Sequence, residues 1–223
     1  MECGRTARAP GVRGGQDQLF VGVDGCRGGW LAALLGPEGL RFELYARIAE
    51  LLREVGQSNT PAWRALVDMP VGLPHAGAPT RRCDAEARKL LGARRASVFP
   101  PPCREALSAA SHAEASAVNR SVTGRGLSIQ SWNIAPRIRE LDELLRSQPY
   151  LADKLLEAHP ELCFAELLGA PARHSKKTAP GREERVEILL GLCPEAKARI
   201  VQRLEKYAGL ATRDDFADAL VLA

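Results

Sequence analysis

Long hydrophobic segments are missing from this sequence of 223 residues. No stretch reaches the roughly 18–20 consecutive apolar residues that a membrane-spanning helix requires. The first 18 residues, MECGRTARAPGVRGGQDQ, carry charges but lack the apolar stretch of a secretory signal peptide. We therefore expect a soluble, cytoplasmic protein without a membrane partner, in which residues 1–18 form a flexible N-terminal tail.

Cysteines at metal-binding or redox spacing are also lacking. None of the six cysteines lies in a C-x-x-C pair or at a Cys/His spacing; they are Cys3, Cys26, Cys83, Cys103, Cys163 and Cys193. This scatter is typical of reduced thiols, and it argues against a zinc site or a disulfide framework.

A large excess of positive or negative charge is also lacking. The chain has 31 Lys and Arg against 27 Asp and Glu, a net charge of +4, and only 5% of its residues are aromatic. A polyanionic partner is permitted, but the basic stripe with interspersed aromatics of a dedicated nucleic-acid-binding surface is missing. The sequence also lacks a Walker loop and a Ser/His/Asp order, which argues against P-loop chemistry and acyl transfer.

What is present is the composition of a globular chain. Hydrophobic residues make up 45% of the sequence and charged residues 26%, and the length is sufficient to bury a sizeable core. The sequence shows neither internal repeats nor an obvious linker. We therefore predict a single domain over residues 19–223.

Apolar runs at the start of this domain predict strands. Residues 19–24, 30–35 and 40–45 are short apolar or alternating segments joined by turns that contain glycine, which is typical of an antiparallel meander. Residues 48–55 carry apolar side chains at helical spacing, and residues 64–68 form another apolar run that ends in a carboxylate. The predicted order is three strands, a helix and a fourth strand.

The rest of the chain is predicted to be mainly helical. The predicted helices span 80–91, a segment that begins at Pro136, 182–190, 194–207 and 214–223. Residues 155–159 fit either a helix or a strand. Because Pro160 blocks a continuous helix, we favour a strand followed by a helix over residues 161–168.

Two carboxylates stand at the ends of predicted strands. Asp24 and Asp68 each close an apolar run just before a turn that contains Gly or Pro. Ligand sites lie at such strand ends, and two acids that converge there repel each other unless a cation neutralises them. Mg²⁺ or Mn²⁺ is the natural candidate, because both prefer oxygen ligands. The alternative is that each aspartate merely caps a turn.

The predicted C-terminal helix carries two further carboxylates. Asp215 and Asp218 lie at positions i and i+3 and therefore share one face of the helix. Compensation of the helix dipole explains Asp215 well and Asp218 poorly. We therefore take Asp24, Asp68, Asp215 and Asp218 as candidate metal ligands.

Several motifs, in order along the chain, resemble those of one protein family. They are VGVDGCRGGW (21–30), DMPVGL (68–73), RCD (82–84) with AR (87–88), SVFPPPCR (97–104), EAHPE (157–161) and SKKT (175–178). Together they resemble the DUF429 family, whose members are described as predicted ribonuclease H-like nucleases. The resemblance spans residues 19–223.

The resemblance implies a ribonuclease H-like α/β fold, with a mixed sheet of three antiparallel strands and then parallel strands, flanked by helices and carrying a helical insertion. In that fold class the acids come from the first strand, the fourth strand and a late helix. These positions match Asp24, Asp68 and the pair Asp215 and Asp218. Glu157 lies where a fifth strand would end, so the implied catalytic set is Asp24, Asp68, Glu157 and Asp218.

The implied function is that of a metal-dependent nuclease or phosphodiesterase acting on nucleic acid or a small phosphoester. Two Mg²⁺ or Mn²⁺ ions about 4 Å apart could bridge the phosphodiester, one activating water and the other stabilising the leaving oxygen. Two alternatives stay open: a non-catalytic metal- or nucleic-acid-binding module, and a phosphotransferase like actin and the sugar kinases, which share the core fold.

Basic and polar side chains outside the acidic set are candidate substrate contacts. Arg27 lies in a Gly-rich turn, Arg104 follows a proline run, and Gln130 belongs to a segment that could form a loop over the site. Lys176 and Lys177 lie in a compact basic loop and would suit a substrate phosphate. An ordinary structural or surface role is the alternative for each.

Overall fold

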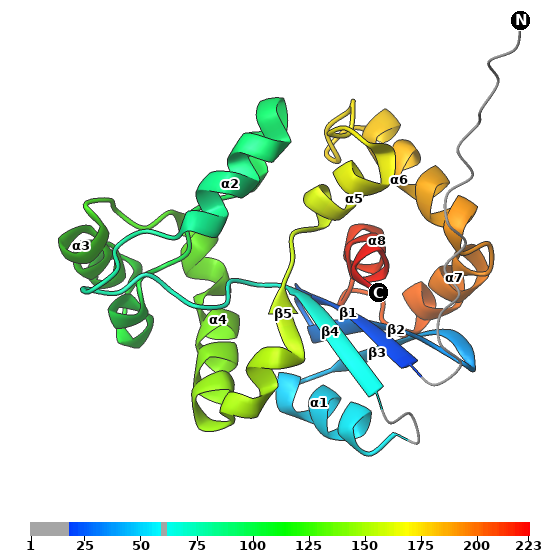
Figure 1. Cartoon of the computed structure of the whole chain (residues 1–223), viewed down its shortest axis with the longest axis horizontal. Coiled ribbons are helices and arrows are strands. Elements are labelled where there is room, and N and C mark those ends of the chain that lie inside the picture. The colour runs from blue at the N-terminus through cyan, green and yellow to red at the C-terminus, as the bar shows by residue number, and fades with distance from the viewer. Residues whose placement is uncertain (1–17, 59–61) are drawn as a thin grey trace, which may run out of the picture.

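The computed structural model describes residues 18–58 and 62–223. The predicted tail over residues 1–18 lies outside this range except for Gln18, the first residue of β1. A five-stranded sheet with the order β3-β2-β1-β4-β5 forms the centre (Figure 1). Its strands are β1 (Gln18–Cys26), β2 (Gly29–Gly36), β3 (Gly39–Tyr45), β4 (Ala62–Asp68) and β5 (Leu155–Glu157).

The strand directions confirm the predicted fold class. β1, β2 and β3 pair antiparallel, whereas β4 pairs parallel with β1 and β5 pairs parallel with β4. The result is a mixed sheet flanked by helices, consistent with a ribonuclease H-like fold. The strand predicted over residues 155–159 is confirmed at Leu155–Glu157, and the helix after it begins at Pro160.

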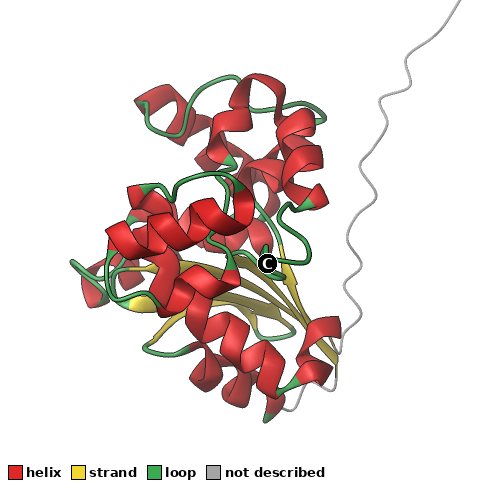
Figure 2. Cartoon of the chain, turned by 90° about the vertical axis from the view of Figure 1, so that its left-hand side faces the viewer, coloured by secondary structure: helices red, strands yellow, loops and turns green. Residues whose placement is uncertain are grey.

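Helices cover both faces of the sheet (Figure 2). Alternate residues of β2 separate the two layers, because Trp30, Ala32 and Leu34 join one core cluster and Leu31 and Ala33 join the other. α1 (Ile48–Gly56) and α4 (Ile129–Ser147) pack on the first cluster. The second is covered by α5 (Pro160–Leu168), α6 (Ala179–Leu192), α7 (Ala196–Lys206) and α8 (Arg213–Leu222). No helix within these described ranges is long and apolar enough to cross a membrane.

A helical insertion joins β4 to β5. It contains α2 (Arg82–Leu91), η1 (Gly92–Ser97), η2 (Arg104–Ser108), α3 (His112–Thr123), α4 and η3 (Pro149–Asp153). The insertion has a small core cluster of its own, formed by Cys103, Ala106, Ala109, Ala115 and Leu127. Its α4 also reaches the sheet, where Ile138 and Leu141 are buried in the first core cluster.

The prediction that a helix begins at Pro136 is wrong. Pro136 lies inside α4, which starts two turns earlier at Ile129. The hydroxyl of Ser128 accepts a hydrogen bond from the N–H of Ser131 at 3.0 Å and so caps the helix there. Burial of Ile138 and Leu141 keeps the helix continuous beyond the proline. Gln130 therefore lies in the first turn of a helix rather than on a loop over the site.

The C-terminal helix packs directly against β1. At Gly22 an added Cβ would lie only 1.9 Å from the carbonyl oxygen of Ala219 and 2.6 Å from the amide nitrogen of Ala223. Glycine is therefore required at this position by the close approach of α8. This approach also fixes the position of Asp218, one residue before Ala219.

We expect the substitution Gly22→Ala to destabilise the fold by about 3 kcal/mol, because the methyl group would push α8 off the sheet. Gly56→Ala is the matched control, since nothing lies within 4 Å of an added Cβ there; in a helix it should stabilise by up to about 1 kcal/mol. Urea unfolding measures both. Equal stability of Gly22→Ala and the wild type would contradict the described packing.

Candidate functional site

Asp24 and Asp68 face each other across two neighbouring parallel strands. Asp24, near the end of β1, is paired in register with Asp68, the last residue of β4. Both line one cavity of about 660 Å³ at the C-terminal ends of β1, β4 and β5. The parallel pairing of the strands therefore places the two acids predicted from strand-end patterns at a single site.

Asp218 approaches this pair from α8. The helix begins with a capping box in which the Thr212 hydroxyl accepts the N–H of Asp215 and the Asp215 carboxylate accepts the N–H of Thr212 at 2.7 Å. One turn later, Asp218 is buried between α8 and the sheet and is close enough to raise the pKa of Asp24. We call Asp24, Asp68 and Asp218 the three-aspartate group.

Burial and mutual repulsion disfavour the charged forms of this group. Burial raises the pKa of Asp24 well above its usual value, and the charges of Asp68, Asp218 and Asp215 raise it further. Burial also raises the pKa of Asp68 to about 6, although His159 and Lys176 oppose the change. Without a cation the group therefore tends to hold protons, and a bound cation would favour the ionised carboxylates by offsetting both burial and repulsion.

One cation that the chain supplies is Lys176. Its Nζ lies 2.7 Å from Oδ2 of Asp218. Burial alone would lower the pKa of the Lys176 ammonium, but Asp218, Asp68 and Asp24 outweigh burial and raise it. Burial likewise raises the pKa of Asp218 while Lys176 acts in the opposite direction. Lys176 and Asp218 therefore form a charged pair at the edge of the site.

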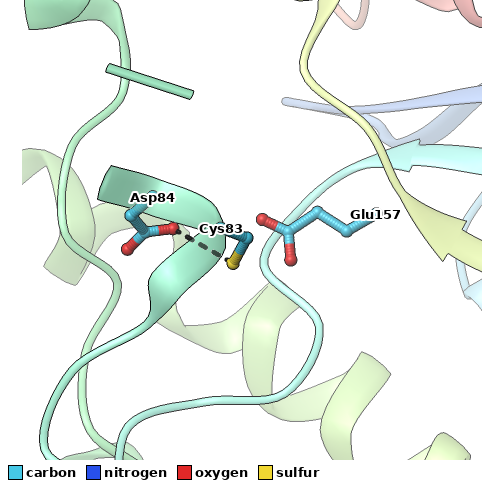
Figure 3. Close-up of side chains that lie close together, drawn as sticks. All are labelled: Cys83, Asp84 and Glu157. Atoms are coloured by element: carbon cyan, nitrogen blue, oxygen red, sulfur yellow. Dashed lines mark hydrogen bonds between the residues drawn. The ribbon is translucent and has the colours of Figure 1, made fainter. Parts of the chain in front are cut away.

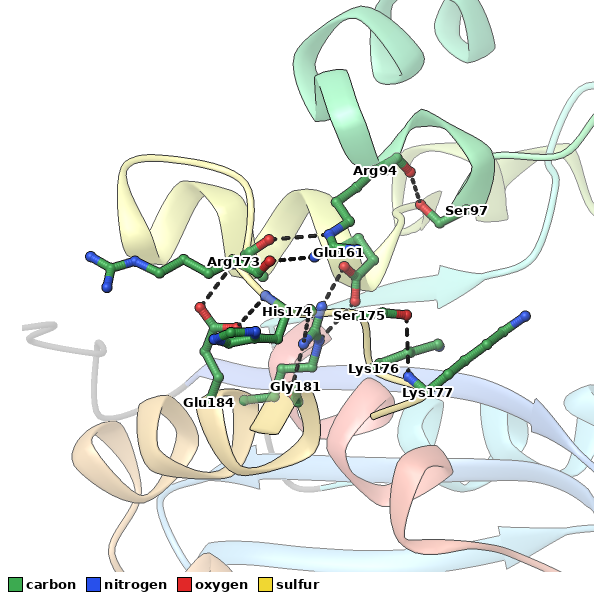
Figure 4. Close-up of polar contacts among 12 residues, drawn as sticks. Arg94, Ser97, Glu161, Arg173, His174, Ser175, Lys176, Lys177, Gly181 and Glu184 are labelled. Carbon is green, nitrogen blue, oxygen red and sulfur yellow. Dashed lines mark hydrogen bonds and ion pairs between the residues drawn. The ribbon is translucent and has the colours of Figure 1, made fainter. Parts of the chain in front are cut away.

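The loop that carries Lys176 is held by polar contacts on several sides (Figure 4). Arg94 of η1 donates to the carbonyl oxygens of Ala172 and Arg173. Glu184 of α6 accepts the N–H groups of Arg173 and His174, each at 3.0 Å. The loop is therefore tied both to the insertion and to α6.

A buried ion pair supports the same loop. Arg185 binds Glu161 through two hydrogen bonds of 2.8 and 2.6 Å, and both side chains are almost fully buried. Arg185 also donates to the carbonyl of His174 at 3.2 Å. At Gly181 an added Cβ would lie 2.0 Å from the Ser175 carbonyl oxygen, so the loop lies directly on the start of α6.

Glu157 lines the cavity but is engaged by an arginine. Its carboxylate pairs with Arg81 and accepts the N–H of Val71 at 2.8 Å. Arg81 lies 3.2 Å from Asp84 as well. Potential ligand atoms of Cys83, Asp84 and Glu157 all lie within 4.8 Å of one another (Figure 3). Because the Arg81 guanidinium already pairs with both carboxylates, we do not assign this cluster a metal.

The three-aspartate group is spaced more widely. Among the described residues, it does not meet the 4.8 Å spacing found for Cys83, Asp84 and Glu157. Asp24 and Asp68 stand in register on their strands, whereas the Asp218 carboxylate is drawn to Lys176. A cation would therefore find Asp24 and Asp68 as its nearest partners, with Asp218 set to one side.

The other residues predicted for the site separate into two sets. Gln130, Lys176 and Lys177 line the cavity. Arg27 is exposed in the turn between β1 and β2 and does not line it. Arg104 binds both carboxylate oxygens of Asp142 on α4 and is likewise outside the cavity lining.

Several residues of the cavity were not predicted from the sequence. Asn133 lies one turn after Gln130 on α4, so a correct helix start would have indicated it. Arg94 of the insertion lies in none of the motifs, and Phe99 lies in the SVFPPPCR motif, which gave no indication that its ring faces the cavity. Glu161 and Arg185 are 24 residues apart, and only the tertiary fold shows that they pair.

His159 has a structural role at the cavity wall. Its Nδ1 accepts the N–H of Glu161 at 3.2 Å, and its Nε2 lies 3.2 Å from the carbonyl oxygen of Ser97. This pattern places the ring proton on Nε2, since a carbonyl can only accept. His159 therefore caps α5 and links it to η1.

Comparison with known proteins gave one match. A family model described as "Protein of unknown function (DUF429)" matches residues 22–223, which include the three-aspartate group and the whole insertion. Neither the curated proteins nor the solved structures gave a match.

In the presence of a chelator we expect the free energy of unfolding to fall as the pH rises from about 5 to about 7.5. Folding raises the pKa of Asp24 and Asp68, so in this range the folded chain binds more protons than the unfolded chain. Asp68 alone should account for roughly 1 to 2 kcal/mol. Urea unfolding at the two pH values measures the change.

The matched control for this experiment is the double variant Asp24→Asn with Asp68→Asn. It keeps the shape of both side chains but removes both ionisations, so the fall in stability should largely disappear. An identical fall in the double variant would show that other groups cause it.

Proposed function

The chain belongs to the DUF429 family, and we propose that it is a divalent-metal-dependent phosphodiesterase. The substrate would be a phosphodiester of a nucleic acid or a nucleotide. Mg²⁺ or Mn²⁺ would be held by Asp24 and Asp68, with Asp218 beside them. The observation that carries this proposal is the pairing, in register at one end of two parallel strands, of buried Asp24 with half-buried Asp68, both with raised pKa values.

The chemistry of the donor groups fits a hard divalent cation. All three side chains offer carboxylate oxygens, which Mg²⁺ and Mn²⁺ prefer over nitrogen and sulfur ligands. A bound cation would oppose the burial and the repulsion that together raise the pKa values of Asp24 and Asp68. When bound, it would supply an electrophile for a phosphate oxygen and increase the acidity of a water molecule.

The remaining cavity residues suit the rest of a phosphodiester. Lys177 is exposed, and its ammonium forms no ion pair with any described residue, so it is available for a phosphate. The side-chain amides of Gln130 and Asn133 make no hydrogen bond within residues 18–58 and 62–223 and can bind a sugar or a base. Phe99 offers an exposed ring on which a base can stack. His159 is not assigned a proton transfer, because both ring nitrogens are engaged.

The size of the cavity favours a small or flexible substrate. Its volume of about 660 Å³ lies within the range of pockets that bind small molecules. The insertion and the Lys176 loop both contribute to the cavity wall, with Gln130 from one and Lys177 from the other. A nucleotide or the end of a single strand fits between these walls more readily than a duplex.

Mn²⁺ should stabilise the folded chain. A ligand that binds only the folded state at 100 times its dissociation constant adds about 2.7 kcal/mol. We expect the thermal midpoint to rise in about 1 mM Mn²⁺ at about pH 7.5, and to rise less at about pH 5, where protons compete for the carboxylates. Asp68→Asn should lose most of the rise. A midpoint that Mn²⁺ leaves unchanged in the wild type would contradict the metal site.

Hydrolysis should depend on the same residues. With Mn²⁺ present, we expect the wild type to cleave a generic aryl phosphodiester, a dinucleotide or a single-stranded oligonucleotide. Asp24→Asn should lower kcat by about 100-fold or more, equivalent to about 3 kcal/mol of transition-state free energy. Initial rates measured over a series of substrate concentrations separate kcat from KM.

Asp153→Asn is the control, because it removes an exposed carboxylate on η3 outside the cavity. Its rate should equal that of the wild type. Cleavage that survives in Asp24→Asn would locate the activity elsewhere. A wild type that binds Mn²⁺ but cleaves none of these substrates would favour the non-catalytic metal-binding alternative.

A further inference from the structure

Lys176 differs from its neighbour Lys177 in burial and in its charged partner. Lys176 is partly buried, and its ammonium lies 2.7 Å from the Asp218 carboxylate. Lys177 is exposed, and within the described part of the chain its ammonium has no acidic partner. In Figure 4 the Lys177 side chain extends away from the loop. A surface role explains Lys177 but does not explain Lys176.

The backbone around Lys176 leaves it little freedom. Residues 172–174 are bound by Arg94 on one side and by Glu184 on the other. Arg185 and Gly181 contact the loop just before Lys176, at His174 and Ser175, and Arg182 donates to the Lys177 carbonyl at 3.2 Å just after it. These contacts therefore hold the Lys176 ammonium in a fixed position beside the acids.

The formal charges have a simple sum. Three ionised aspartates carry −3 and the Lys176 ammonium carries +1, which leaves −2 to be balanced. One divalent cation balances this charge, whereas two would leave an excess of +2 in a partly buried site. Partly buried charge without a partner is strongly unfavourable, so electroneutrality selects a single divalent cation.

We propose that Lys176 is a resident cation that takes the place of a second metal ion, so that the three-aspartate group binds one divalent cation per chain. This inference rests on the metal site of the proposed function, but it does not require hydrolysis. It differs from the expectation of two metal ions that the sequence raised. In the proposed reaction, the Lys176 ammonium supplies the fixed positive charge that a second ion would bring to the phosphate.

The test is the number of Mn²⁺ ions bound per chain, counted by electron paramagnetic resonance of free Mn²⁺ during a titration of the full chain. The wild type should bind one ion at this site. Lys176→Met leaves −3 on the aspartates, so one cation leaves a charge of −1, and it frees the Asp218 carboxylate from its ion pair; we therefore expect a second ion to bind in the place of the ammonium. Lys177→Met removes the same charge from the adjacent residue and should bind one. Asp24→Asn with Asp68→Asn defines the background from other carboxylates, including Glu157.

Two further variants keep the test valid if Lys176→Met is unstable. Lys176→Arg retains the charge and should bind one ion. Lys176→Met with Asp218→Asn removes the whole pair, restores a sum of −2 and should also bind one. Circular dichroism confirms that each variant is folded. Two ions on the wild type, or one ion on folded Lys176→Met, would overturn the inference.

The same data separate this inference from the proposed function. Absence of hydrolysis together with the expected ion counts would remove the phosphodiesterase and leave the role of Lys176 intact. Metal-dependent hydrolysis by a wild type that holds two ions would do the reverse.

Discussion

The repulsion between Asp24 and Asp68 is the constraint on which the rest of the site depends. The parallel register of β1 and β4 brings the two carboxylates together, and partial burial at the cavity floor raises the pKa of both. An isolated buried carboxylate is among the most costly groups in a protein. The elements around the pair must therefore bring positive charge, and the Lys176 loop does so from within the chain.

The buried ion pair of Arg185 and Glu161 supports that loop. Replacing a buried ion pair with apolar residues is often neutral, so Arg185 and Glu161 do not have to stabilise the fold. Their value lies in geometry, because Arg185 binds Glu161 at the start of α5 and also binds backbone carbonyls on both sides of Lys176. One guanidinium thus links the start of α5, the loop and α6.

Local pattern was sufficient for the sheet and for the two aspartates on it. Alternation in β2 and the apolar runs before Asp24 and Asp68 are short-range signals, and the parallel pairing then follows from the connecting helix. The insertion was harder, because Pro136 looked like a helix start although the Ser128 cap lies two turns earlier. The salt bridge between Arg81 and Glu157 spans 76 residues, so no local pattern indicates it.

The insertion forms one wall of the cavity and has a core cluster of its own, separate from the sheet that carries the acids. Asp24 and Asp68 belong to the sheet, whereas Phe99, Gln130 and Asn133 belong to a segment between β4 and β5 that has apolar packing of its own. Substitutions or changes of length in that segment can therefore reshape the wall that meets a ligand without moving Asp24 or Asp68. Chains with this architecture can diverge in what they recognise while the charged floor of the cavity stays the same.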